Sequence, residues 1–169
     1  PYILQGQEIG MTNFPFRTID DFEDVHAKGI WANNVLTGKF LAATVLRDLA
    51  KTTRENTRTP MHWTDGANGG FTTGTPWYRV NPNTDRINVA TQLNDPASVL
   101  SFYRRLIEVR AAHPGLIYGQ FHDIDPEHPA VCVFVRGAGG TRYLVLINMT
   151  SQEQKYRLPK GVALSSVIV

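Results

Sequence analysis

Residues 51–83 read KTTRENTRTPMHWTDGANGGFTTGTPWYRVNPN, and the interpretation of the rest of the chain depends on this stretch. It contains too much glycine, proline, asparagine and threonine to form one helix or one strand. It also holds more large aromatic side chains than a disordered linker would. An ordered loop of about 30 residues without regular structure is uncommon and is usually functional. The stretch therefore predicts a folded lip of a binding site, and the elements before and after it are expected to be scaffold.

Arg54 and Arg58 are the charged candidates for ligand binding in this loop. Because Glu55 lies between them, one arginine can hold the loop through an ion pair while the other faces a ligand. A planar guanidinium suits vicinal hydroxyls and carboxylates, although loop arginines are as often structural. Trp63 and Trp77 suit stacking on a sugar ring, but a small core within the loop explains them equally well. Both interpretations stay open at this point.

The composition excludes several classes of partner. The net charge is only +2, from 17 basic and 15 acidic residues spread along the chain, which predicts neither a nucleic-acid partner nor an anionic membrane partner. No apolar run approaches the roughly 18 residues that a membrane helix needs. Cys132 is the only cysteine, lies in an apolar run and is expected to be a small buried hydrophobe. This fits a reducing compartment, and we expect a cytoplasmic protein.

Helices are expected mainly in the first two thirds of the chain. The apolar run at residues 2–4 is too short for a helix and predicts a buried strand, stopped by Gly6. Three helices are then expected, over residues 19–28 with Asp20 or Asp21 as N-cap, over residues 38–50, and from Pro96 to about residue 112 with Asp95 as N-cap.

Strands are expected after residue 115. The predicted strands cover residues 116–122, 130–136, 141–149, 154–158 and 164–169, and residues 137–140 read as a hairpin turn. A run of strands after helices favours a separate small antiparallel domain, with a boundary near residues 117–120.

No complete catalytic or metal site is visible in the sequence. The five histidines are scattered, and there is no phosphate loop and no G-x-S-x-G elbow, so we expect no metal and no cofactor. Glu8 follows the first predicted strand, which is a good position for catalysis. Hydrogen bonds from Gln5 and Glu8 to nearby backbone explain both residues more simply. The acidic residues at 20–24 are explained by the dipole at a helix start.

Several motifs, in the right order, carry a resemblance to a known family. They are PYILQGQEIGMTN, RENTRTPMHW, GFTTGTPW, VNPN, INV, QLNDP and SVLSFYRRLIEVR. The chain resembles the C-terminal part of glycoside hydrolase family 13, in the branch of oligo-1,6-glucosidases and α-glucosidases. That branch also includes sucrose isomerases and trehalose-6-phosphate hydrolase. The two ends of the chain also look cut from a longer protein, which we call the parent protein.

The resemblance implies an α+β chain built from two parts. Residues 1–118 would hold the last β/α unit of a TIM (β/α)8 barrel, with the eighth strand, an active-site loop and the eighth helix. Residues 119–169 would begin a C-terminal antiparallel β-domain. The rest of the barrel would lie upstream and would be the main protein surface that this chain contacts.

The resemblance also implies the reaction. The family hydrolyses α-glucosidic bonds with retention, using an Asp nucleophile, a Glu acid/base and a second Asp, and retention places two carboxyl groups close together. All three would lie upstream, so no residue of this chain is assigned as catalytic. The expected substrate of the parent protein is a short oligosaccharide with a terminal α-glucosidic bond, α-1,6 in the first place.

Site residues follow from the motifs residue by residue. Arg54 matches the family arginine that grips the non-reducing glucose at subsite −1. Arg58 matches the structural part of the same motif, and Gln5, Gly6 and Glu8 match the turn after the last barrel strand.

Three positions depart from the family pattern. Glu55 stands where Asp is usual, and His62 stands where Gln is usual. His26 occupies the position at which many members carry a Glu that faces the +1 sugar, so we assign His26 to substrate binding and leave linkage preference open. Two alternatives to a glycosidase remain: a non-catalytic amylase-like binding or interaction protein, and an independent sugar-binding module. The presence or absence of an Asp, a Glu and an N-H-D triplet upstream would decide whether the parent protein is catalytic.

Overall fold

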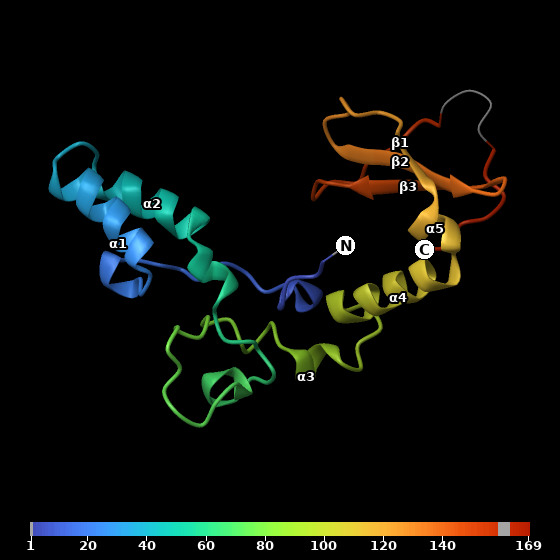
Figure 1. Cartoon of the computed structure of the whole chain (residues 1–169). Coiled ribbons are helices and arrows are strands. Elements are labelled where there is room, and N and C mark those ends of the chain that lie inside the picture. Colours follow the sequence, from blue (N-terminus) through green and yellow to red (C-terminus); the bar gives the residue numbers. More distant parts are fainter. Residues whose placement is uncertain (1, 159–162) are drawn as a thin grey trace. The chain divides into compact units, whose positions relative to one another are not determined.

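The computed structural model describes residues 2–158 and 163–169, and these form two compact units, Pro1–Tyr103 and Arg104–Val169 (Figure 1). Helices occupy both units, and a three-stranded antiparallel sheet lies in the second unit. The α+β class expected from the sequence is therefore present. The domain boundary expected between residues 118 and 119 remains a prediction.

The first unit is built from short helical segments joined by irregular chain. Its elements are η1 (Gln7–Ile9), η2 (Ile19–Asp21), α1 (Val25–Trp31), the π-helical η3 (Ala32–Leu36), α2 (Ala42–Thr52), η4 (Arg54–Thr57), η5 (Ala67–Gly70), α3 (Val89–Gln92) and the beginning of α4 (Val99–Ala112). Phe22, Ala27, Val45 and Leu49 form the buried core between α1 and α2. Residues 51–83 are mostly irregular, as predicted.

The strand predicted at residues 2–4 is wrong. These residues have no regular structure, and Tyr2, Ile3 and Leu4 are exposed. A strand needs neighbours that accept and donate its backbone hydrogen bonds, and the described part of the chain offers it none.

The helix predicted over residues 19–28 is also wrong, because the chain forms a single 3-10 turn and then restarts. Thr18 and Asp21 make a capping box that closes η2, and Phe22 is extended at φ −90° and ψ 135°. Phe22 thereby enters the core with no exposed surface. The new helix α1 begins at Val25, with Asp24 rather than Asp20 or Asp21 as its N-cap.

The two longer helices were predicted more closely. α2 begins four residues later than expected and buries Val45 and Leu49. α4 ends at Ala112 as predicted, but it begins at Val99 instead of Pro96. Ser98 Oγ accepts a hydrogen bond from the Ser101 amide at 3.1 Å, so Ser98 performs the capping that was expected of Asp95.

In the second unit, α5 (Pro114–Tyr118) precedes the antiparallel sheet of β1 (Gln120–Asp123), β2 (Val131–Ala138) and β3 (Thr141–Asn148). Ala138 pairs with Thr141 across a two-residue turn, in which Gly139 and Gly140 have φ values of 60° and 89°. Both values lie in the left-handed region that such turns require, so the predicted hairpin is confirmed.

Four predictions for the second unit are wrong. Residues 116–122 are not one strand, because Pro114 starts the helix α5 at its first turn and β1 begins only at Gln120. The strands predicted at residues 154–158 and 164–169 do not form. Cys132 is exposed because it alternates along β2 with the buried residues Val131 and Val133.

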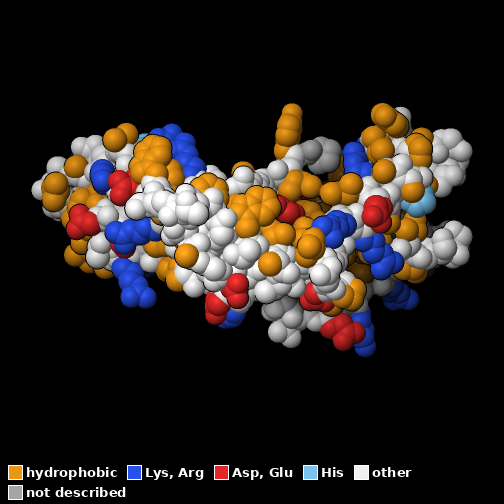
Figure 2. Space-filling model, turned by 90° about the horizontal axis from the view of Figure 1, so that it is seen from below, with side chains coloured by type: hydrophobic (Ala, Val, Ile, Leu, Met, Phe, Trp, Pro, Cys, Tyr) orange, Lys and Arg blue, Asp and Glu red, His pale blue; other side chains and the backbone are white. Residues whose placement is uncertain are grey.

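Large apolar side chains are exposed on both units, and Figure 2 shows many hydrophobic side chains at the surface. On α4 these are Val99, Phe102, Leu106 and Ile107. The described chain therefore lacks the protein surface that would cover its apolar faces.

Candidate functional site

The carboxylate of Asp24 is the centre of the candidate site. It accepts hydrogen bonds from Nε of Arg54, from Nη2 of Arg54 at 2.8 Å and from Nη1 of Arg58 at 3.4 Å. It also accepts the backbone N–H of His26 at 2.9 Å, which makes it the N-cap of α1. Only 3% of the Asp24 side chain is exposed, against 56% for Arg54. A buried anion thus holds one side of a half-exposed guanidinium.

Glu55 joins the same two segments, the turn η4 and the residues before α1, but here the acceptor lies on η4. Its side chain is buried, with Oε1 accepting from the Asp24 amide at 2.9 Å and Oε2 from the Glu23 amide at 3.0 Å. The 3-10 turn η4 places Glu55 on the inner side and Arg54 on the outer side, because consecutive residues of a helical turn point in different directions. The residues before α1 therefore supply two backbone donors, and η4 supplies the buried acceptor.

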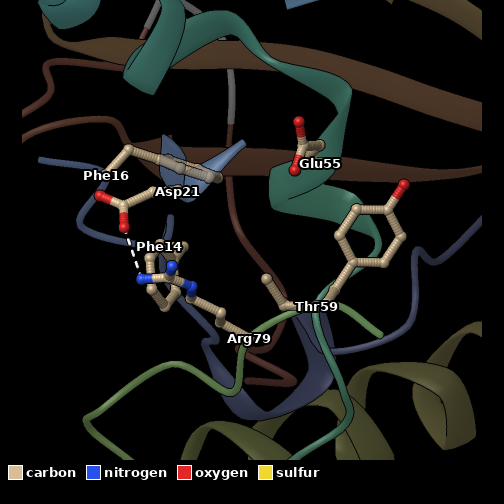
Figure 3. A pocket seen from close by; sticks show the side chains of 7 residues that line it. Phe14, Phe16, Asp21, Glu55, Thr59 and Arg79 are labelled. Atoms are coloured by element: carbon tan, nitrogen blue, oxygen red, sulfur yellow. Dashed lines mark hydrogen bonds and ion pairs between the residues drawn. The ribbon is translucent and has the colours of Figure 1, made fainter. Parts of the chain in front are cut away.

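A second ion pair holds the loop at Asp21. Asp21 faces Arg79 across the ion pair drawn in Figure 3, and its other oxygen accepts the amides of Arg17 at 2.7 Å and Thr18 at 2.9 Å. Burial raises the pKa of Asp21, but these two amides and the arginine charges outweigh it, so the pKa lies below its ordinary value. Asp21, Arg79 and Glu55 help to line a cavity of about 10 Å³, which is about the least that one water molecule needs.

The charge of Asp24 is strongly stabilised. The Arg54 hydrogen bonds, followed by the His26 amide, hold the pKa of Asp24 far below its ordinary value of 3.8, against the opposing effect of burial. The same pair raises the pKa of Arg54. Both partners are therefore ionised at neutral pH.

The depressed pKa of Asp24 predicts a stability contribution that depends on pH. A carboxyl whose folded-state pKa lies below its unfolded value stabilises the fold above the unfolded value and loses this effect as pH falls through the folded one. Asp24→Asn should therefore be less stable than the wild type at about pH 6, and the difference in urea midpoint should shrink steadily as pH is lowered below about 4. An equal difference at every pH would contradict the prediction.

An open groove of about 250 Å³ lies along the loop. It is lined by Gln5, Thr57, Arg58, Thr59, Pro60, Phe71, Pro76, Trp77 and Tyr78. Trp77 stacks on Tyr78 at 5.0 Å and is 77% exposed. Trp63 is half exposed, so neither tryptophan forms a buried core of the loop. Aromatic faces beside arginine and amide donors suit a carbohydrate surface.

His62 is a buried framework residue. It has no exposed surface, and its Nδ1 lies 2.8 Å from the carbonyl of Ile87. Its backbone carbonyl accepts from the amide of Val89 at 3.0 Å. These contacts join the loop to the start of α3 from inside, away from the groove-lining residues.

Comparison with known proteins decides the family. Residues 1–119 match the model described as "Alpha amylase, catalytic domain". The chain belongs to the alpha-amylase family. The match covers most of the chain. This membership agrees with the resemblance of the motifs to glycoside hydrolase family 13.

Relatives of this alpha-amylase-family chain match it almost end to end. A probable oligo-1,6-glucosidase of Bacillus subtilis is 37% identical over 100% of this chain and 30% of the relative. A trehalose-6-phosphate hydrolase of Escherichia coli is 38% identical over 93% of this chain and 28% of the relative. The crystal structure of the trehalulose synthase MutB from Pseudomonas mesoacidophila superposes with a TM-score of 0.91 and 47% identity, over 95% of this chain and 29% of that one. A variant of that synthase has been solved with its substrate sucrose. The chain thus spans about 30% of the length of the curated relatives it matches.

The structure of this alpha-amylase-family chain brings some of the expected site residues together. Arg54, Arg58 and the backbone of His26 meet at Asp24, and the His26 side chain is exposed at the start of α1. Both arginines contact the same carboxylate, so the ion pair is shared between them. The expectation that one of them faces a ligand remains a prediction.

The turn of Gln5, Gly6 and Glu8 adjoins this cluster along the groove, which Gln5 and Arg58 both line. Oε2 of Glu8 accepts the Gly6 amide at 2.8 Å, and Gly6 has a φ of 94° that favours glycine. Gln5 lines the groove, and the neighbouring Gln7 rather than Gln5 accepts the Leu4 amide at 2.9 Å.

Asp24 and Glu55 are the residues whose importance the sequence did not indicate. Asp24 does cap a helix, as an acid at a helix start should, but most of its hydrogen bonds go to arginines of the loop. The available signal was charge: two arginines flanking one glutamate need a nearby acid, and the acidic residues at 20–24 are the obvious source.

The part of the chain that the structure describes contains no group of three or more His, Cys, Asp or Glu side chains that could hold a metal. None of its helices is long and apolar enough to span a membrane. The cytoplasmic location remains a prediction.

Proposed function

We propose that the parent protein is a retaining α-glucosidase that hydrolyses terminal α-glucosidic bonds of short oligosaccharides, with α-1,6 bonds preferred. Family membership and the relatives that bear the names oligo-1,6-glucosidase and trehalose-6-phosphate hydrolase support this proposal. This chain supplies part of the substrate-binding wall, and the catalytic carboxylates come from the upstream part of the barrel.

The observation that carries the proposal is the held arginine. Arg54 gives Nε and Nη2 to Asp24, and within the described residues its Nη1 group has no hydrogen-bond partner. A guanidinium fixed on one side and half exposed presents its remaining N–H groups as a ready donor pair. Two vicinal hydroxyls of a terminal glucose are a fitting acceptor pair. His26, exposed at the start of α1, is assigned to the neighbouring +1 sugar.

The 169-residue chain by itself is expected to be inactive. No catalytic carboxylate is assigned within it, so binding donors alone should give no turnover. Incubation of the purified chain with p-nitrophenyl α-glucoside should release nitrophenol no faster than a buffer blank. Release above the blank, retained through a second purification step, would overturn the claim that the catalytic groups lie upstream.

A sucrose isomerase is the second candidate, because the trehalulose synthase MutB is 47% identical to the aligned part of this chain. One experiment separates the two functions: the parent protein is given isomaltose and sucrose separately, and the products are resolved by chromatography. Glucose from isomaltose supports the glucosidase. Conversion of sucrose into another disaccharide without matching glucose release supports the isomerase. No conversion of either sugar supports a non-catalytic amylase-like protein.

A further inference from the structure

Arg54 is held by a single carboxylate in a defined orientation. The Nε–H and one Nη2–H of a guanidinium lie along one edge of a rigid plane, and both point at Asp24. Because the guanidinium is planar, engaging this edge directs the Nη1 donors along another edge. Removing the Asp24 charge would leave a long side chain, 56% exposed, free to populate several rotamers.

The ion pair is not needed to hold the two segments together. Glu55 already joins them through the amides of Glu23 and Asp24, at 3.0 Å and 2.9 Å. The Asp21–Arg79 pair joins the same stretch to the loop at a second place. The Asp24–Arg54 pair adds to the stability of this docking, but the two segments do not depend on it alone. The contribution that only Asp24 makes is the orientation of Arg54.

We infer that Asp24 is a positioning residue, which sets the orientation in which Arg54 meets the terminal sugar of the substrate. The inference rests on the proposed function, because it needs Arg54 to bind substrate. Asp24 does not touch the sugar in this arrangement and acts through Arg54. Arg58, at 3.4 Å from the same carboxylate, supplies a second positive charge that keeps Asp24 ionised.

The experiment is a double-mutant cycle in the parent protein. Asp24→Asn keeps the size of the side chain and an oxygen that can cap the His26 amide, but it removes the charge and points an N–H₂ group at Arg54. Alone it should lower kcat/KM on isomaltose by about 10- to 100-fold, with KM raised. In an Arg54→Ala background it should cost no further activity, because the residue through which it acts is gone.

Asp21→Asn is the matched control. Asp21 lies on the same segment as Asp24 and pairs with an arginine of the same loop, Arg79. Among the described residues, Arg79 makes no hydrogen bond or ion pair with Asp24 or Arg54. Asp21→Asn should lower the thermal midpoint while leaving kcat/KM within about twofold. The inference is overturned if Asp24→Asn is as costly in the Arg54→Ala background as alone, if Asp21→Asn lowers kcat/KM equally, or if Asp24→Asn retains wild-type kcat/KM.

Calorimetric binding of glucose separates this inference from the proposed function. In one outcome the wild type binds glucose without turnover, and Asp24→Asn, Arg54→Ala and the double variant weaken that binding to the same extent. The inference then holds while the proposed function fails. Turnover by the wild type with additive losses in the cycle would sustain the function and overturn the inference. A wild type with neither turnover nor glucose binding would overturn both.

Discussion

Arg54→Ala is expected to lower kcat/KM of the parent protein on isomaltose by about 100-fold or more. The substitution removes charge-assisted donors from a sugar that the enzyme must hold at one end, and water cannot replace them with the same geometry. It also leaves Asp24, whose side chain is 3% exposed, with the 3.4 Å contact from Arg58 as its one remaining ion pair among the described residues, beside the hydrogen bond from the His26 amide. Rates are therefore normalised to the folded fraction measured by circular dichroism.

Arg47→Ala is the control for this experiment. Arg47 lies on α2 and is 63% exposed, and among the described residues it pairs only with its neighbour Asp48, at 3.3 Å. The same change of residue type there should leave kcat/KM unchanged. Arg54→Lys should recover little activity, because a point charge cannot reproduce the planar donor edge. Near-normal kcat/KM in Arg54→Ala would remove Arg54 from the substrate site.

Glu55→Ala is expected to be the most damaging substitution for stability in this part of the protein. Its carboxylate is the acceptor for the amides of Glu23 and Asp24, and only 1% of Glu55 is exposed. Each backbone donor left unpaired and buried costs about 1–3 kcal/mol, so the free energy of unfolding should fall by roughly 2–6 kcal/mol. Urea unfolding followed by circular dichroism measures this change.

Two variants make the Glu55 result specific. Glu55→Gln keeps one acceptor oxygen but turns an N–H₂ group toward the other amide, and should lie between the wild type and Glu55→Ala. Glu23→Ala removes only a side chain that is 42% exposed and retains the backbone donor to Glu55, so it should shift stability by less than about 0.5 kcal/mol. A Glu55→Ala protein as stable as Glu23→Ala would show that water reaches these amides.

Local patterns predicted the elements whose causes are local. The stripe of Val45 and Leu49 on α2, the end of α4 at Ala112 and the Gly139-Gly140 turn all depend on residues a few positions apart. Two elements were predicted wrongly although their causes are local, since the Thr18–Asp21 capping box closes η2 and Pro114 starts α5. The strand predicted at residues 2–4 depends instead on partners distant in the chain. Residues 2–4 have the composition of a buried strand, but no described strand pairs with them.

The candidate site divides in the same way. The motif around Arg54 was recognisable from the sequence because its residues are contiguous, and the resemblance to family 13 attached a role to it. Asp24 and Glu55 were passed over because their bonds join positions about 30 residues apart. No period or spacing in the sequence records that kind of pairing.

The sequence alone indicated the family, the hairpin and the approximate extent of the two longer helices, while the assignment of Arg54 to a sugar remains a prediction. These follow from contiguous motifs and from local hydrogen bonding and side-chain periodicity. Only the tertiary structure decided that both arginines share the Asp24 carboxylate, that Glu55 is a buried acceptor and that Cys132 is exposed. Each of these outcomes depends on which residues, distant in the sequence, come together and shield one another from water. Folding of the chain decides that.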